Sequence, residues 1–525
     1  MNLFSLEFII LLLITFILYY AAFGINKLAK RIIIPQWLLL LIASLIFYGF
    51  VNYIYLIYLG ISFFVSYVTA ICCQYKLFKR VPSEEAEAVY EFNPSRVDSH
   101  TKRRKYENII TTISIVINVG ILAVLKYFNF FASSVSSLLH LSITTYNFII
   151  PLGISFYTFS LIAYNVDCCK RTTNAEKNPF KFLLFVSYFP KVLQGPISSY
   201  DRLKEDGLFN GHSFKDNNYL KAFLRISIGL IKKIAIANVL NLYVNASYSN
   251  LDNSFGGGLL LTSILYTIQL YCDFSGFADI IIGISNLFGI KLEENFNIPY
   301  ISSSISEFWR RWHITLGAWL KKYIYIPLGG NRVPVWRWVI NTLIVWLISG
   351  LWHGANWTFV IWGLFHGILI VLSGLPKQIK KNSGATIEEK ENNRIIKMLS
   401  IIGTFVLVNI GWIFFRSNSI GEAGTFIVHS IQFWKTGSYS LFSDPSISKA
   451  NWLFIVSIIF VIVLILIKVL SVNKRLLELK IWKGELITTI STYVVTIVFF
   501  SVSIFVFVYL NSIGGGESSF IYFDF

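Results

Sequence analysis

Long runs of apolar residues, separated by short polar and basic stretches, recur along the whole chain. Typical runs are "FIILLLITFILYYAAFGI" near the N-terminus, "WLLLLIASLIFYGF" after it and "WLFIVSIIFVIVLILIKVL" near the C-terminus. A run of about 18–20 apolar residues can cross a bilayer as a helix. The pattern therefore predicts an all-α, polytopic integral membrane protein with about 11–12 transmembrane helices. The predicted spans begin near residues 7, 36, 54, 109, 146, 219, 257, 338, 356, 396, 453 and 485.

The distribution of Lys and Arg between these runs predicts an orientation. "NKLAKR" at 26–31 follows the first span, and the loop 74–107 carries "KLFKR" and "KRRK" two spans later. Since cytoplasmic loops are enriched in Lys and Arg, we expect both loops in the cytoplasm and the N-terminus outside. With twelve spans, the C-terminus is also expected outside. The first run lacks a basic n-region and a small-residue cleavage site, so no cleaved signal peptide is expected.

Composition fits a membrane protein and argues against nucleic-acid binding. The chain has 525 residues, 55% of them hydrophobic, a mean hydropathy of +0.62 and a formal net charge of +17. The positive charge lies in loops, where it sets orientation, and no DNA- or RNA-binding motif accompanies it. The lipid bilayer, and not nucleic acid, is the partner that this charge predicts. The cysteines form two adjacent pairs and one single position, which indicates neither a disulfide framework nor a metal site: Cys72, Cys73, Cys168, Cys169 and Cys272.

Segment 305–332 combines aromatic and basic residues in a helical pattern. Its large apolar residues are spaced three or four apart, which predicts one continuous stripe: Trp309, Trp312, Leu316, Trp319 and Tyr323. Its basic residues lie off that stripe: Arg310, Arg311, Lys321 and Lys322. A helix of this kind suits a membrane surface. It is either purely architectural, or its basic residues hold an anionic donor such as coenzyme A.

Three of the seven histidines, His313, His353 and His366, fall in apolar surroundings. His353 has the richest context, "SGLWHGANW", in which Gly350 and Gly354 allow close backbone approach. An imidazole titrates near neutral pH and is suited to general-base catalysis, and an ionisable residue at membrane depth is a candidate for function. The alternative is a core histidine satisfied by a backbone carbonyl.

Other residues could support or replace such a site. If the chain is helical beyond His353, Asn356 shares a face with it. Asp273 and Asp279 lie in "YCDFSGFADIIIG", where pairing with Lys or Arg to hold helices together is favoured over catalysis. Segments 151–167 and 188–197 are broken by Pro and Gly, which is tolerated in a membrane where the backbone is buried in protein or lines a cavity. Together these features predict a cavity with broken walls and a histidine.

The motifs "SEFWRRWHITLGAWLKKYIYIPLGGNR" and "SGLWHGANWTFVIWGLFHG", with "PLGISFYTF", "YFPKVLQGPI" and "YCDFSGFADIIIG" before them, resemble the membrane-bound O-acyltransferase family. The resemblance is to its bacterial branch, which serves alginate O-acetylation, peptidoglycan O-acetylation and D-alanyl transfer to teichoic acid. It implies helices around a central tunnel in one domain, 1–525, with a core at about 100–415, C-terminal spans at 396–510 and an extracytoplasmic tail at 511–525.

The resemblance also implies roles for particular residues. His353 corresponds to the catalytic histidine of the family, and His313 to the histidine often discussed beside it. Trp352, Asn356 and Asp273 are then supporting residues, and the four basic residues of segment 305–332 would bind the donor. The final "FIYFDF" resembles a C-terminal motif of this branch, in which Tyr522 would relay the acyl group.

The implied activity is O-acyl transfer across a bacterial cytoplasmic membrane. The donor would be acetyl-CoA or an acyl-carrier-protein thioester, with no bound cofactor, and the acceptor an extracytoplasmic polysaccharide. A secreted serine-hydrolase-like enzyme is the implied partner, with D-alanyl transfer to teichoic acid, aided by a carrier protein, as the alternative. Two functions from other classes also stand: a secondary transporter, although the chain lacks two similar halves, and a non-catalytic membrane scaffold.

Overall fold

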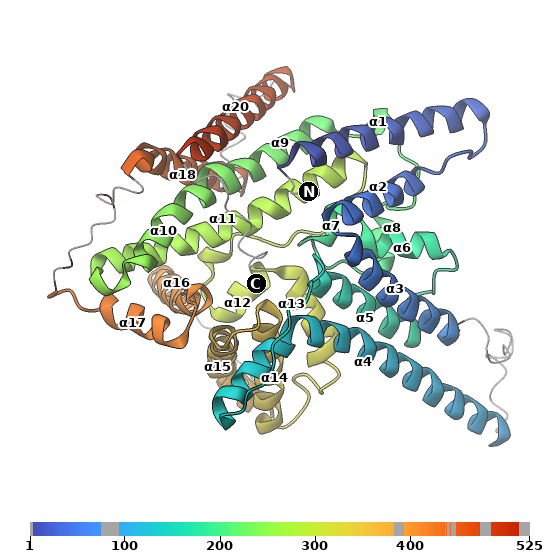
Figure 1. Cartoon of the computed structure of the whole chain (residues 1–525), viewed down its shortest axis with the longest axis horizontal. Helices are drawn as coiled ribbons and strands as arrows, with labels where there is room; N and C mark the ends of the chain where they lie inside the picture. The colour runs from blue at the N-terminus through green and yellow to red at the C-terminus, as the bar shows by residue number, and fades with distance from the viewer. Residues whose placement is uncertain are drawn as a thin grey trace. The chain divides into compact units, whose positions relative to one another are not determined.

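The computed structural model describes residues 4–74, 94–382, 393–435, 437, 442, 448–472 and 485–513. Within these ranges every regular element is helical (Figure 1), as the sequence predicts. The chain forms two compact units. The first comprises 1–217 and 285–292, and the second comprises 218–284 and 293–525.

The first unit packs the N-terminal helices around short, Pro-containing ones. Its α-helices are α1 (Leu6–Ala29), α2 (Gln36–Val51), α3 (Tyr53–Gln74), α4 (Pro94–Leu139), α5 (Ile154–Cys169), α6 (Pro179–Ser187), α7 (Phe189–Val192) and α8 (Tyr200–Glu205). α2 contacts α1, α3, α6 and α7, and α5 contacts α3 and α4 (Figure 1). The break between α6 and α7 is held by Ser44, whose hydroxyl accepts the Phe189 N–H at 3.1 Å, so α2 stabilises the irregular backbone.

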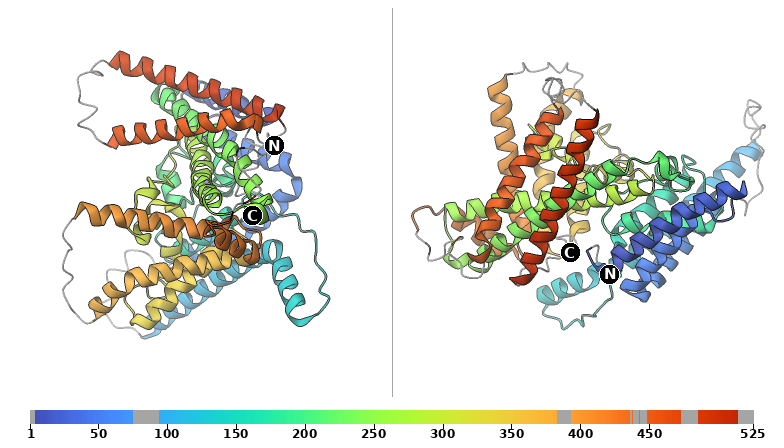
Figure 2. Two further views of the ribbon diagram at one scale, coloured as in Figure 1. Left: turned by 90° about the vertical axis from the view of Figure 1, so that its left-hand side faces the viewer. Right: turned by 90° about the horizontal axis from the view of Figure 1, so that it is seen from above.

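The second unit contains the remaining α-helices and two π-helical segments, η3 (Ile231–Asn238) and η6 (Lys321–Tyr325). Its α-helices are α9 (Tyr219–Leu230), α10 (Val239–Ser249), α11 (Gly257–Leu287), α12 (Ile305–Arg311), α13 (Ile314–Leu320), α14 (Val335–His353), α15 (Trp357–Asn382), α16 (Arg394–Arg416), α17 (Ile420–Ser430), α18 (Asn451–Val472) and α20 (Glu485–Ser512). The last three residues of α11 belong to the first unit. Figure 2 shows α14, α15 and α16 side by side, and α20 packs on α9.

Nine helices of the described ranges are long and apolar enough to cross a membrane. They match nine of the predicted spans. The other three predicted spans differ: the one near 36 is the 16-residue helix α2, and the one near 146 becomes helical only at Ile154. The one near 219 is the α9–η3–α10 helix, which carries Arg225, Lys232 and Lys233. Pro151 and Gly153 explain the late start at 154, because Gly153 caps α5 in the left-handed conformation with φ 71°.

Helix α11 is enclosed by protein, unlike the peripheral spans. In its most apolar 18-residue window 89% of the residues are buried, against 28% in α1. It approaches α9 closely through glycines: a Cβ on Gly229 would lie 2.6 Å from the Gly276 carbonyl oxygen, and one on Gly283 3.0 Å from that of Ala222. Small residues let membrane helices pack backbone to backbone, and this contact brings the acids of α11 beside the cations of η3.

The acids of α11 are paired, which agrees with the interpretation favoured from the sequence. Asp273 forms an ion pair with Lys233, and both side chains are almost fully buried. Asp279 accepts from Lys232 and from Arg225, each at 2.6 Å. Charges taken out of water are tolerated when they are paired and hydrogen-bonded, so these residues hold α9, η3 and α11 together.

Candidate active site

The prediction of one continuous surface helix over 305–332 is wrong. The chain leaves the helix at Trp312, His313 adopts a left-handed conformation with φ 44° and ψ 54°, and a new helix begins at Ile314. Trp312, Leu316 and Trp319 are buried in the protein. The aromatic residues therefore do not form one lipid-facing stripe, because the break turns α13 relative to α12. A left-handed, bulky residue is strained and is often found at functional sites.

His353 is the last residue of α14, held where α14 and α15 cross at very short distance. A Cβ on Gly350 would lie 3.3 Å from the Gly363 Cα, and one on Gly363 would lie 3.1 Å from the Gly350 Cα. At Gly354 a Cβ would meet the Phe359 ring, 3.1 Å from its Cζ. The close approach predicted for Gly350 and Gly354 is confirmed, and it fixes the end of α14 that carries His353.

The His353 imidazole lies in an aromatic enclosure. Only 3% of the residue is exposed. Its ring packs edge-to-face against Trp352 (centroids 4.8 Å apart), Trp362 (4.9 Å) and Phe415 (5.2 Å). Three helices, α14, α15 and α16, supply these rings. The enclosure excludes bulk water from the imidazole.

His313 contacts the same Trp352 ring as His353. The Trp352 ring is 5.7 Å from the His313 ring and 4.8 Å from that of His353. Phe274 of α11 packs edge-on against His313 at 4.8 Å. Burial lowers the pKa of His313 from 6.5 to about 3, so His313 is a neutral imidazole at pH 7. Trp352, predicted as a supporting residue, thus contacts both histidines.

His366 completes a group of three buried imidazoles. It is fully buried on α15, and its Nδ1 accepts a hydrogen bond from the Trp309 indole at 3.4 Å. The Trp362 ring contacts both His366 (centroids 5.2 Å apart) and His353 (4.9 Å). The sequence singled out His366 by its apolar context but gave it no role; the convergence of His313, His353 and His366 in one aromatic cluster emerges only from the fold.

Several polar atoms of this cluster are buried without a partner among the described residues. They include Nδ1 and Nε2 of His313, Nε2 of His366, and Nε1 of Trp362 and of Trp412. A buried polar atom without a hydrogen bond costs about 1–3 kcal/mol. Native proteins keep few such atoms, and a catalytic or ligand-binding role is one reason for keeping them. The cluster therefore combines imidazoles, an indole donor and dry walls.

The other predicted supporting residues lie elsewhere. The chain is not helical at Asn356, so Asn356 does not share a helical face with His353. Its side chain instead accepts the Thr358 N–H at 3.1 Å and donates to the Asn418 carbonyl at 2.9 Å, which caps α15 and ties it to the loop after α16. Asp273 is in the ion pair with Lys233. Tyr522 lies outside the described residues.

The four basic residues predicted to bind the donor divide into two groups. Arg310, Lys321 and Lys322 are exposed. Arg311 is half-buried, donates to Glu307 at 2.8 Å and 3.0 Å, and also donates to the Asn297 carbonyl at 3.2 Å. Arg311 is thus engaged in holding α12 to the segment before it, and the other three are accessible.

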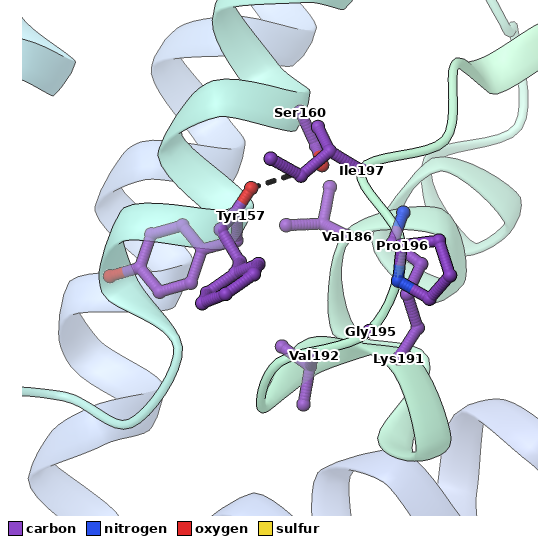
Figure 3. Close-up of a pocket in the computed structure, with 9 residues that line it drawn as sticks. Tyr157, Ser160, Val186, Lys191, Val192, Gly195, Pro196 and Ile197 are labelled. Carbon is purple, nitrogen blue, oxygen red and sulfur yellow. Dashed lines mark hydrogen bonds between the residues drawn. The ribbon is translucent and has the colours of Figure 1, made fainter. Parts of the chain in front are cut away.

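The first unit contains a narrow pocket walled by the Pro/Gly-broken segment. Figure 3 shows α5, with Tyr157 and Ser160, on one side and Lys191, Gly195 and Pro196 on the other. Segment 188–197 thus lines a narrow pocket, but this pocket is not the predicted cavity that combines broken walls with a histidine. No histidine is among the described residues that line it. The lysine is buried, and its ammonium lies 4.6 Å from the centre of the Phe185 ring.

Residues 124–379 match the profile of the MBOAT, membrane-bound O-acyltransferase, family. The matched stretch contains all three histidines of the cluster. Among the described residues, no group of His, Cys, Asp and Glu side chains could hold a metal ion.

Curated relatives give the same family. The chain is 34% identical over 434 residues to the peptidoglycan O-acetyltransferase of Helicobacter pylori, and the aligned region covers 76% of this chain and 74% of the relative. It is 36% identical over 319 residues to the probable alginate O-acetylase of Pseudomonas aeruginosa, covering 59% of this chain and 58% of the relative. To the teichoic acid D-alanyltransferase of Bacillus subtilis it is 28% identical over 284 residues, covering 51% and 69%. The match thus spans about three-fifths of the alginate relative.

Proposed function

Because this chain belongs to the membrane-bound O-acyltransferase family, we propose that it is an O-acyltransferase with His353 as its catalytic base. The observation that carries the proposal is the buried cluster of His353, His313 and Trp352 within the stretch that matches the family. We propose that residues 1–525 form one integral membrane enzyme.

The proposed chemistry follows from the surroundings of His353. A neutral imidazole takes the proton of the attacking hydroxyl, and the hydroxyl oxygen attacks the thioester carbonyl. The thiolate then leaves with the proton that the imidazole returns. Aromatic walls exclude water, which would otherwise hydrolyse the thioester. His313 is neutral and strained, and we propose that it positions a reactant in this reaction, with Trp352 packed against both imidazoles.

We propose an acetyl group as cargo and an extracytoplasmic polysaccharide as its destination. The alginate and peptidoglycan relatives, both named for O-acetylation, support this choice. The weaker match to teichoic acid D-alanyltransferases supports D-alanyl transfer as the second candidate. The two candidates are distinguished in a strain from which the gene for this chain is deleted and then restored. Mild base treatment of the cell-surface polymers of the restored strain releases acetate if the cargo is acetyl, and D-alanine if it is D-alanyl. If the treatment releases neither acetate nor D-alanine, the proposal is contradicted.

The donor is proposed to be acetyl-CoA, or an acyl group on a carrier protein, without a bound cofactor. Both carry a phosphopantetheine thioester, and coenzyme A carries several phosphates. Arg310, Lys321 and Lys322 are exposed and suit the anionic part of the donor. Arg311 is committed to Glu307, so we propose that it shapes the donor site without touching the donor.

Replacing Arg310, Lys321 and Lys322 together by Gln is expected to raise the KM for acetyl-CoA about tenfold, because exposed charge contacts contribute up to about 1 kcal/mol each. The kcat should change little, since a contact remote from the reacting bond acts as uniform binding. Steady-state kinetics in lipid nanodiscs measures both, with Lys215→Gln, an exposed lysine elsewhere, as the control. A large fall in kcat with unchanged KM would contradict the donor role.

We propose the bacterial cytoplasmic membrane as the location, with both termini outside. The acyl group would then leave through the C-terminal tail, with Tyr522 as the relay and a serine-hydrolase-like enzyme outside the membrane as the receiver. A phenol is a weak nucleophile until a base takes its proton, and its ester is more reactive than an alkyl ester. Cysteine labelling of the termini in intact cells tests the orientation: protection of either terminus would overturn it.

Tyr522→Phe removes only the hydroxyl and is expected to lower polymer acylation at least tenfold. Transfer of labelled acetyl to the protein itself should also disappear. The matched control is Tyr509→Phe, which removes a hydroxyl that donates to the Lys449 carbonyl at 2.9 Å and should leave acylation near the wild-type rate. Normal acylation by Tyr522→Phe would mean that the tail only anchors the chain.

A further inference from the structure

The Trp362 indole has an unusual position in the aromatic cluster. It is fully buried on α15, and among the residues that the structure describes its Nε1 has no hydrogen-bond acceptor. Two other indoles of the same unit are paired: Trp309 donates to His366 at 3.4 Å, and Trp338 donates to the Tyr325 hydroxyl at 3.0 Å. The Nε1 of Trp412 is likewise buried without an acceptor among the described residues. A buried Trp N–H usually finds a partner, and of these two indoles Trp362 is the one with a described ring contact to His353.

The surroundings hold Trp362 rigidly beside the candidate base. Its ring packs edge-to-face on His353, with centroids 4.9 Å apart and planes at 85°. It stacks on Trp412 at 5.9 Å and 17°, and Phe415 closes another side at 5.3 Å. A fixed donor in a water-poor enclosure needs no reorganisation when charge develops near it, and this makes such donors effective in catalysis.

We propose that the Trp362 indole N–H is an oxyanion donor in acyl transfer. The inference rests on the proposed function of this site. When the hydroxyl loses its proton to His353 and attacks the thioester carbonyl, a C–O bond forms and the carbonyl electron pair moves to oxygen. The Trp362 N–H donates to that oxyanion. On collapse the carbonyl re-forms, the C–S bond breaks, and the thiolate takes the proton from His353.

The proposal explains why the donor has no acceptor among the described residues. An acceptor supplied by the protein would compete with the substrate carbonyl, and the oxyanion would then gain little. A carbonyl oxygen entering the cluster satisfies the indole, and the hydrogen bond strengthens as negative charge develops. The donor therefore favours the transition state over the bound substrate, which is the requirement for raising kcat.

The test replaces Trp362 site-specifically with a tryptophan analogue in which a sulfur atom takes the place of the indole N–H group. This replacement preserves the ring shape and removes the hydrogen-bond donor. Acylation is measured as base-labile acetate on surface polymers, in a strain lacking the wild-type chain, and as release of free thiol from acetyl-CoA by the protein in nanodiscs. We expect kcat to fall about 10²–10³-fold with little change in the KM for acetyl-CoA. The kcat of the Trp362→Phe variant should fall by at least the same factor.

Trp346→Phe is the matched control, because Trp346 packs on Trp309 and Trp362 but has no contact with His353 among the described ring contacts. It should retain activity within about threefold, the scatter expected of a conservative change. If the sulfur analogue matches the wild type while His353→Ala is inactive, the oxyanion role is wrong and the proposed function stands. If the wild type transfers no acyl group in either assay, both are overturned.

Discussion

Replacing His353 by alanine is expected to lower acyl transfer by about 10²–10⁴-fold, the range that a general base contributes. The imidazole is buried among Trp352, Trp362 and Phe415, and water that entered the space left by alanine would be a poor substitute for a fixed base. His353→Gln keeps much of the volume and a hydrogen-bonding group but cannot accept a proton at neutral pH. The same loss in both variants would assign the effect to the base and not to a cavity.

The measurement is acyl transfer from labelled acetyl-CoA, with membrane insertion checked by size-exclusion behaviour in detergent. The result also separates the rival functions. Normal acylation in a well-inserted His353→Ala protein would mean that the chain is a scaffold for another acyltransferase. Movement of a substrate across the membrane without acylation, in the wild type, would indicate a transporter.

Much of the fold follows from the hydrophobic pattern, because a bilayer leaves few solutions for a long apolar run. Nine predicted spans coincide with long apolar helices. The pattern fails where a helix is short or polar: α2 has 16 residues, and η3 carries Lys232 and Lys233 inside the α9–α10 helix. Those lysines are explained by Asp273 and Asp279 of α11, contacts that no local pattern contains.

The candidate site was only partly predictable, for a similar reason. Residue type and context single out His353, His313 and His366, since imidazoles are rare in apolar surroundings. Periodicity then misleads, because spacings of three and four from Trp309 to Tyr323 predict one helix, whereas the chain turns at Trp312 and His313. The turn buries the tryptophans around the histidines. No sequence signal marks the Trp362 indole as lacking an acceptor among the described residues. That property depends on which side chains the fold places around the indole N–H.

Breaking the buried Lys233–Asp273 pair is expected to destabilise the protein severely. Asp273→Asn removes the charge that compensates Lys233 in a site where both residues are almost fully buried. Removing one partner of such a pair costs about 3–5 kcal/mol, a large part of the total stability of a domain. Thermal unfolding in detergent should show a clearly lowered midpoint. Arg202→Gln, which breaks the partly exposed Arg202–Asp206 pair, should change stability by less than about 1 kcal/mol.

The double replacement Lys233→Met with Asp273→Leu then decides what Asp273 contributes to the enzyme. Replacing a buried pair by apolar residues of similar volume is often neutral or stabilising, so the double variant should recover most of the lost stability. Asp273 precedes Phe274, whose ring packs on His313, and a purely structural role predicts that activity returns with stability. A double variant as stable as the wild type but inactive would instead place the Asp273 carboxylate in the chemistry.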